Sequence, residues 1–181
     1  MGFSGIIPSQ LKVLIDETQL QQRVRELGEQ IALDYCGKNL HLVCILKGAC
    51  IFLADLVRHL PLDISLDFMA VSSYPQSLHT SGEVRIVKDL DSSIQGREVL
   101  IVEDILDTGL TLDYLSRTLS ARNPRSLRIC ALLSKASQRI IDVKAAYIGF
   151  EIPNEFVVGY GLDFAEKYRN LSAIAVMKKD K

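Results

Sequence analysis

Two patterns of apolar positions alternate along the chain of 181 residues: a three-to-four spacing typical of helices, and short apolar runs or strict alternation typical of strands. The helical spacing is clearest at Leu20, Val24, Leu27 and Ile31. Thr18, followed by Gln21 three residues later, predicts the N-cap and capping box of this helix, and Gly37 predicts its end. Residues 1–17 show little pattern, so we expect a loosely packed arm.

Short apolar or alternating segments predict the strands of a sheet. They cover residues 40–46, 62–71, 83–90, 99–102, 127–133, 145–152 and 156–158. Helical spacing returns at 50–59 and 110–122, whereas 171–177 fits either a last strand or the continuation of a helix. Strands that alternate with helices predict an α/β fold, a twisted, mostly parallel sheet flanked by helices. The strand at 83–90 is expected to return antiparallel from a long polar loop at 72–82.

Polar side chains gather directly after the apolar run at 99–102. Three carboxylates, Glu103, Asp104 and Asp107, fall within five positions, and Thr108, Gly109 and Thr111 follow them. Ligands bind beyond the carboxyl ends of parallel strands, where a small-residue loop at a helix N-terminus suits a phosphate. Carboxylates upstream of it suit ribose hydroxyls, which donate hydrogen bonds to them. The simpler alternative for Asp107 alone is a helix N-cap.

Composition narrows the classes of function. A formal net charge of −1 provides no overall positive field for nucleic acid or an anionic membrane, so a small-molecule ligand is favoured. No apolar run approaches the roughly 20 residues of a membrane span. Four cysteines without CxxC spacing indicate buried thiols in a reducing compartment, so we expect a cytoplasmic protein. The chain also lacks the common phosphate-loop, dinucleotide, hydrolase and zinc-protease motifs.

The segment Val99–Thr111 resembles the phosphoribosyl-pyrophosphate signature of the type I phosphoribosyltransferases. From about Leu40 to Leu171 the chain resembles the hypoxanthine (hypoxanthine-guanine) phosphoribosyltransferases of that family. The segments that carry this resemblance are Leu46–Gly48, Val71–Tyr74, Lys88–Leu90, Lys135 and Phe150–Asp163. The last of them is more specific than the acidic segment, which all type I members share.

The resemblance implies one phosphoribosyltransferase domain over residues 1–181. Its core would cover about 38–145, and a small hood would form from the N-terminal arm and about 146–181. The reaction implied is magnesium-dependent transfer of phosphoribose from phosphoribosyl pyrophosphate to a 6-oxopurine, hypoxanthine and also guanine, which yields the nucleotide and pyrophosphate. Family members also suggest a homodimer or homotetramer. A long mobile β-loop with Ser73 and Tyr74 at its tip would close over the site and shield it from water.

The resemblance assigns the donor to the acidic segment. Glu103 and Asp104 would hold the ribose hydroxyls and help to position Mg²⁺. Asp107 would accept or hold the ring proton of the purine, and its negative charge would favour the cationic sugar. Backbone groups of residues 107–111 would bind the 5′-phosphate. Leu110 stands where some members have a basic residue, so a side-chain charge on that phosphate is not expected here.

The resemblance places pyrophosphate and purine outside that segment. Lys47, Gly48 and Arg169 would bind pyrophosphate, and Asp163 would face a second Mg²⁺. The purine would contact Lys135, Phe156, Val157 and Ile105. As a donor-only ammonium, Lys135 matches a 6-oxo group and opposes the 6-amino group of adenine. Phe156 would stack on the base, and the backbone of Val157 would meet its edge. Without the resemblance, the simpler interpretations are a solvated lysine at a strand end for Lys135, strand core for Phe156 and Val157, and an exposed surface ion pair for Asp163 and Arg169.

Two other functions stay open. A regulator with the same fold would bind RNA through a basic face, for which Arg122, Arg125 and Arg128 offer only a small cluster. A transferase for another base, such as xanthine or a pyrimidine, is the second. Lys135 and Phe156 argue against a pyrimidine more strongly than against xanthine.

Overall fold

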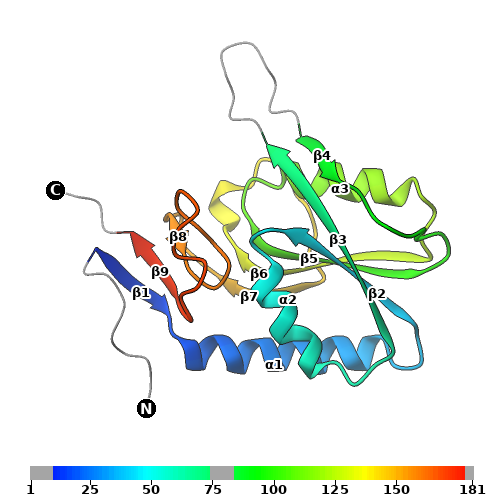
Figure 1. Ribbon diagram of the computed structural model, residues 1–181, viewed down its shortest axis with the longest axis horizontal. Helices are drawn as coiled ribbons and strands as arrows, with labels where there is room; N and C mark the ends of the chain where they lie inside the picture. The colour runs from blue at the N-terminus through cyan, green and yellow to red at the C-terminus, as the bar shows by residue number, and fades with distance from the viewer. Residues whose placement is uncertain (1–9, 74–83, 178–181) are drawn as a thin grey trace, which may run out of the picture.

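A six-stranded sheet forms the centre of the computed structural model, which describes residues 10–73 and 84–177 (Figure 1). Its strands stand in the order β4-β3-β2-β5-β6-β7. Their bounds are β2 Leu40–Leu46, β3 Ile64–Ser73, β4 Val84–Lys88, β5 Glu98–Leu106, β6 Ser126–Ser134 and β7 Tyr147–Glu151. Neighbouring strands run parallel except β3 and β4, which pair antiparallel. The predicted mostly parallel α/β sheet is therefore confirmed.

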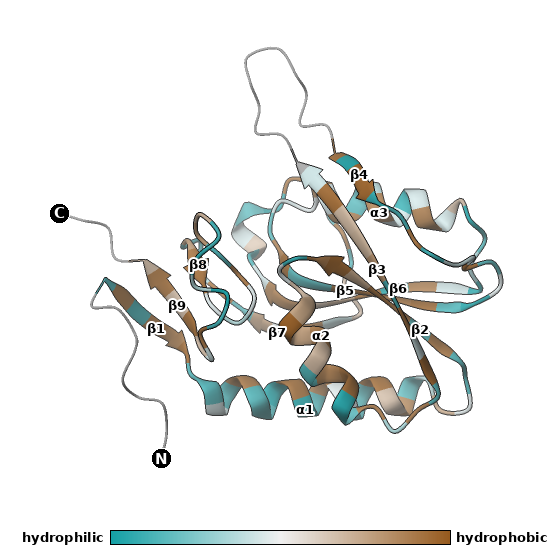
Figure 2. Cartoon of the chain, viewed as in Figure 1, coloured by the Kyte–Doolittle hydropathy of each residue, from teal (hydrophilic) through white to brown (hydrophobic). Residues whose placement is uncertain are grey.

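Helices cover both faces of this sheet. Helices α1 (Glu17–Asp34) and α2 (Cys50–Leu56, continued by the 3₁₀ turn η1, Val57–His59) share one hydrophobic core, and α3 (Leu110–Ser120) belongs to the other. Successive residues of β2 divide between the two cores: Leu42 and Cys44 join the first, Val43 and Ile45 the second. This alternation follows from the two-residue period of a strand. Apolar residues recur along α1 at the intervals of its buried side (Figure 2).

The N-cap of helix α1 lies two residues before the predicted one. Asp16 is the N-cap: its carboxylate accepts a hydrogen bond from the backbone N–H of Gln19 at 2.9 Å, and the Gln19 side chain accepts one from the Asp16 N–H at 3.0 Å. The prediction of Thr18 and Gln21 was therefore wrong, because an equivalent capping pair precedes them. None of the helices in the described part of the chain has the length and apolarity to cross a membrane.

A second, three-stranded sheet joins the two ends of the described chain. Its order is β1-β9-β8, with β1 Leu11–Ile15, β8 Val157–Val158 and β9 Ile174–Met177, all antiparallel. The prediction of a loose arm over residues 1–17 was wrong for β1, since Leu11 and Ile15 are buried and the strand pairs with β9, more than 150 residues away. The open alternative at 171–177 is decided in favour of a strand. The boundary between core and hood stays a prediction.

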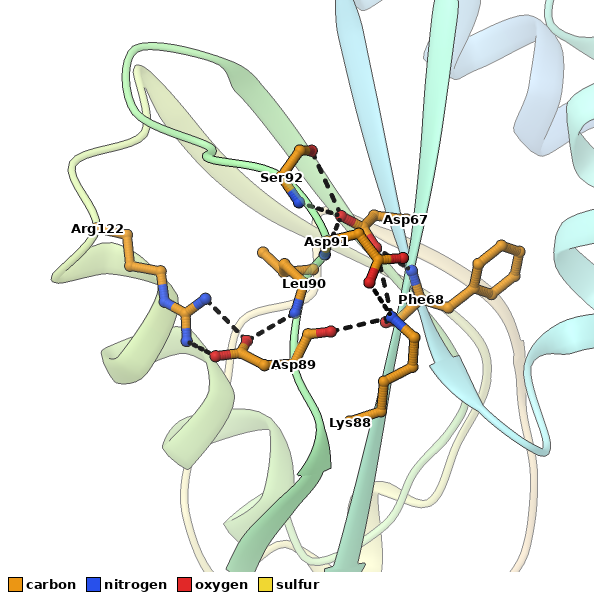
Figure 3. A network of polar contacts seen from close by, with 8 residues as sticks. All are labelled: Asp67, Phe68, Lys88, Asp89, Leu90, Asp91, Ser92 and Arg122. Atoms are coloured by element: carbon orange, nitrogen blue, oxygen red, sulfur yellow. Dashed lines mark hydrogen bonds and ion pairs between the residues drawn. The ribbon is translucent and has the colours of Figure 1, made fainter.

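A buried carboxylate fastens the base of the β3–β4 hairpin (Figure 3). Asp67 on β3 is 3% exposed and accepts hydrogen bonds from the backbone N–H groups of Phe68, Asp91 and Ser92. Lys88 donates to the Phe68 carbonyl at 2.9 Å, and Arg122, just after α3, holds Asp89 through two bonds of 2.8 Å. The network therefore links the hairpin to the end of α3. The predicted loop tip with Tyr74 lies outside the described residues; Ser73 is the last residue of β3.

Candidate active site

Strand β5 continues four residues beyond the predicted run of 99–102 and ends at Leu106. Glu103 and Asp104 therefore belong to the strand, whereas the predicted strand ended at residue 102. Because side chains alternate along a strand, the two carboxylates point to opposite faces of the sheet. Glu103 lines a pocket next to α3, whereas Asp104 lies against Gly48 on the other side. The two acids border two separate parts of the site.

The pocket beside Glu103 has a volume of about 190 Å³. It is lined by Glu103, Ile105, Leu106, Asp107, Thr108, Gly109, Thr111 and Leu112. Gly109 is the N-cap of α3, so the alternative of Asp107 as N-cap is not observed. Leu110 is 37% exposed and does not line the pocket. The pocket therefore combines hydroxyls, a helix N-terminus and two carboxylates, the groups that a sugar phosphate requires.

Burial raises the pKa of both strand carboxylates. Glu103 is 9% exposed, and its Oε2 has no hydrogen-bond partner within residues 10–73 and 84–177. Burial, followed by the charge of Asp104, raises the pKa of Glu103 well above its ordinary value. Burial also raises the pKa of Asp104 to about 6, although the N–H of Ile105 donates to its Oδ1 at 2.7 Å and opposes the shift. A cation or hydroxyl donors bound here would relieve this desolvation.

Lys135 meets Asp107 although 28 residues separate them in sequence. Lys135 follows β6, and its N–H donates to the Leu106 carbonyl at the end of β5 at 3.0 Å. Its ammonium lies 3.4 Å from Asp107 Oδ2, and the residue is 7% exposed. Adjacent parallel strands end at the same sheet edge, which explains the meeting. The structure thus brings together the residues predicted for purine recognition and for proton transfer.

The Lys47–Gly48 turn follows β2 at the same edge, and the Leu46–Lys47 peptide bond is cis. A Cβ on Gly48 would overlap the Asp104 carboxylate, so only glycine fits between the turn and β5. Lys47 is exposed, and its ammonium lies 3.1 Å from Glu166 Oε2. Sequence reasoning missed Glu166; its only signal was its place three residues beyond the motif that ends at Asp163.

Asp163 and Arg169, predicted to bind a second Mg²⁺ and pyrophosphate, form an ion pair with each other at 2.8 Å. Their side chains are 28% and 25% exposed. Arg169 Nη1 also donates to the Gly161 carbonyl at 2.8 Å. The surface ion pair that the residues alone suggested is therefore present in this structure, and a ligand would compete with it.

Val157 belongs to β8 of the small sheet, and Phe156 directly precedes that strand. Val157 is buried in β8, whereas Phe156 is 55% exposed and packs against Phe164, with ring centroids 5.7 Å apart at 81°. Phe156 borders a different hollow of about 650 Å³, which Lys135 does not line. The structure therefore does not place Phe156 and Lys135 in one pocket. Phe164, an exposed aromatic just past Asp163, was also missed.

Magnesium ligands were predicted at Glu103, Asp104 and Asp163. Across residues 10–73 and 84–177, no three His, Cys, Asp or Glu side chains are grouped to hold a metal ion. The three acids thus form no single protein-only centre. Mg²⁺ keeps several waters and takes oxygens from substrate phosphates, so one or two carboxylates are enough. Asp104 beside Gly48 and the Glu103 oxygen that has no partner among the described residues could each supply one such carboxylate ligand, on opposite faces of β5.

Comparison with known proteins gives a consistent result. Residues 14–165 match the model of the phosphoribosyl transferase domain. Hypoxanthine-guanine phosphoribosyltransferase from Mycobacterium bovis is 53% identical over 95% of this chain and 89% of that protein. The enzyme of the same name from Bacillus subtilis is 50% identical, over 92% and 93%. A crystal structure of hypoxanthine phosphoribosyltransferase from Staphylococcus aureus has a TM-score of 0.92 and 46% identity, covering 98% of this chain and 97% of that one.

Proposed function

The chain belongs to the phosphoribosyltransferase family, within it to the hypoxanthine-guanine phosphoribosyltransferases, and we propose that it transfers 5-phosphoribose from phosphoribosyl pyrophosphate to hypoxanthine and guanine. The products would be the purine nucleotide and pyrophosphate, a step of purine salvage. The observation that carries the proposal is the meeting of Lys135 and Asp107, 3.4 Å apart, beside the pocket at the α3 N-terminus.

Donor binding would use the two faces of β5. Thr108, Gly109 and Thr111 line the pocket and would hold the 5′-phosphate through hydroxyls and backbone N–H groups. Glu103 and Asp104 would accept hydrogen bonds from the ribose hydroxyls. Because both carboxylates are poorly solvated, binding of hydroxyl donors stabilises their charged forms and strengthens the attachment.

Chemistry would take place between Asp107 and Lys135. As pyrophosphate leaves, positive charge develops on the ribose carbon, and the purine loses a ring proton. Asp107 would accept that proton, and its charge would favour the cationic sugar. Lys135 would donate a hydrogen bond to the 6-oxo group, and this donor is already held next to Asp107. Ile105, Phe156 and the Val157 backbone would complete the purine contacts, which requires Phe156 and Lys135 to face the same base.

Lys47, Gly48 and Arg169 would bind pyrophosphate. Mg²⁺ would take a carboxylate ligand from Glu103 or from Asp104, which lie on opposite faces of β5, with Asp163 as a candidate for a second ion. When bound, the metal neutralises the charge of the leaving pyrophosphate. The protein's own part is to present the carboxylates and to orient the donor. Arg169 would exchange its contact with Asp163 for the anion.

Location and assembly extend the proposal. All four cysteines are free, which agrees with a reducing, cytoplasmic compartment. Cys44 and Cys130 are buried, whereas Cys36 and Cys50 are exposed, so the prediction of buried thiols was wrong for these two. The family resemblance favours a homodimer or homotetramer, which light scattering would measure. The net charge of −1 argues against RNA as a partner, because RNA binding requires a large basic surface.

Pyrophosphate release tests the function directly. The protein is incubated with phosphoribosyl pyrophosphate, Mg²⁺ and one base at a time: hypoxanthine, guanine, xanthine, adenine or uracil. We expect release with hypoxanthine and guanine and none with adenine or uracil. A preference for xanthine would redefine the acceptor. No release with any purine would remove the enzymatic function, and a salt-sensitive RNA complex would then favour the regulator.

A further inference from the structure

The backbone of Gly161, in the segment that follows β8, packs against the Lys47–Gly48 turn. Gly161 is buried, and its φ of +104° lies in the left-handed region. A Cβ at this residue would lie 2.0 Å from the Gly48 carbonyl oxygen and 3.1 Å from its carbon. No side chain at residue 161 fits into that space, so this contact with the Gly48 carbonyl requires glycine at position 161. The turn and the segment are packed backbone against backbone.

Gly161 is itself held by Arg169. The Gly161 N–H donates to the Arg169 carbonyl at 2.9 Å, and Arg169 Nη1 donates to the Gly161 carbonyl at 2.8 Å. The Asp163 carboxylate pairs with the same guanidinium at 2.8 Å. Because both backbone groups of Gly161 are bonded and their partner is anchored, the position of Gly161 is well defined.

The opposite side of the turn rests on β5, where the Asp104 carboxylate occupies the space of a Gly48 Cβ. The turn is therefore enclosed between Asp104 and Gly161. Lys47 reaches the same segment, since its ammonium lies 3.1 Å from Glu166. This second contact is exposed and adds little by itself.

We propose that Gly161 is a positioning residue: by direct backbone contact it sets the position of the Gly48 peptide that binds pyrophosphate. The inference rests on the proposed pyrophosphate role of Lys47 and Gly48. It predicts that a single methyl group at residue 161 would move this peptide and weaken the binding of pyrophosphate, while purine recognition by Lys135 is kept.

Gly159 provides a matched control. Its φ is +100°, and a Cβ there would lie 2.0 Å from a carbonyl oxygen, that of Ala173. The backbone strain and the overlap therefore equal those at Gly161. The difference is the carbonyl that is displaced: Ala173 precedes β9 in the small sheet and does not belong to the pyrophosphate turn.

The experiment compares wild type, Gly161→Ala and Gly159→Ala as full chains. Calorimetry measures binding of inorganic pyrophosphate with Mg²⁺, steady-state kinetics measures KM for donor and for hypoxanthine, and a thermal melt measures Tm. We expect similar losses of Tm in both variants. Pyrophosphate Kd and donor KM should rise about tenfold or more in Gly161→Ala alone, since a displacement of about 1 Å is enough. Hypoxanthine KM should stay within about twofold of wild type.

Unchanged pyrophosphate affinity in Gly161→Ala, or an equal loss in Gly159→Ala, would overturn the positioning role while leaving the proposed function intact. A wild type that neither binds pyrophosphate nor releases it from the donor would instead overturn the proposed function. If Gly161→Ala does not fold, hydrogen exchange on wild type decides. The backbone amides of Ala49, Cys50 and Gly161 should become exposed to exchange in one common opening. Added pyrophosphate should slow their exchange to the same degree. Independent opening of these amides would refute the positioning role.

Discussion

Replacement of Asp104 by Asn should make the protein more stable and less active at once. The side chain lies against Gly48 at the end of β5, and its burial raises its pKa to about 6. At neutral pH the folded protein therefore carries a charge that its surroundings disfavour. Asn has the same shape, and its carbonyl oxygen accepts the same hydrogen bond from the Ile105 N–H. The substitution removes the charge without opening a cavity.

The magnitude follows from the two pKa values. Asp104 has an ordinary pKa of 3.8 and a pKa of about 6 in the folded protein. The folded state holds the proton more tightly, so stability is lost as pH rises between these values, and the full penalty is present above pH ~6. At 1.36 kcal/mol per pKa unit the difference amounts to about 3 kcal/mol. The gain from Asp104→Asn should thus be about 3 kcal/mol at pH ~7.5 and only about 0.5 kcal/mol at pH ~4.

Urea unfolding of wild type and Asp104→Asn across this pH range measures the gain. Asp142→Asn is a suitable control, because Asp142 is exposed and its substitution should change the free energy of unfolding by less than about 0.5 kcal/mol. Donor KM should rise about tenfold or more in Asp104→Asn, since a charged acceptor for the ribose hydroxyls is lost. A gain that is absent, or equal at both ends of the pH range, would refute the argument from burial.

Three other substitutions test separate parts of the structure. Asp107→Asn should lower kcat by about 10²- to 10⁴-fold with donor binding largely kept, because the contacts to the 5′-phosphate are mainly backbone; lost donor binding in calorimetry would make Asp107 a structural residue. Lys135→Met should lower kcat/KM for hypoxanthine about 10- to 100-fold, the value of a hydrogen bond from a charged donor, and unchanged kinetics would remove Lys135 from purine recognition. Asp67→Ala should lower the free energy of unfolding by about 2–4 kcal/mol in urea, because three backbone N–H groups lose their acceptor; a loss under about 1 kcal/mol would show that water replaces the carboxylate.

The local pattern of apolar residues predicted helices and strands well where buried positions recur at regular intervals. The run at 40–46 became β2 with its predicted bounds, and α3 begins at the predicted Leu110. Errors arose at ends and edges: the N-cap was displaced to Asp16, and β1 was missed. A strand of five residues at the edge of a small sheet carries a weak periodic signal, and its partner β9 lies at the far end of the chain.

The properties of the candidate active site also divide into those that the sequence predicts and those that depend on the tertiary structure. The sequence by itself determined which groups end the central strands, because strand polarity and the order of apolar runs send Lys47, Asp107 and Lys135 to one sheet edge. Only the tertiary structure decided how these groups are charged and enclosed. The burial that raises the pKa of Asp104, the 3.4 Å between Lys135 and Asp107, and the contact of Gly161 with Gly48 all depend on segments far apart in the chain. Such distances and electrostatic effects are set by packing in three dimensions, which no local pattern encodes.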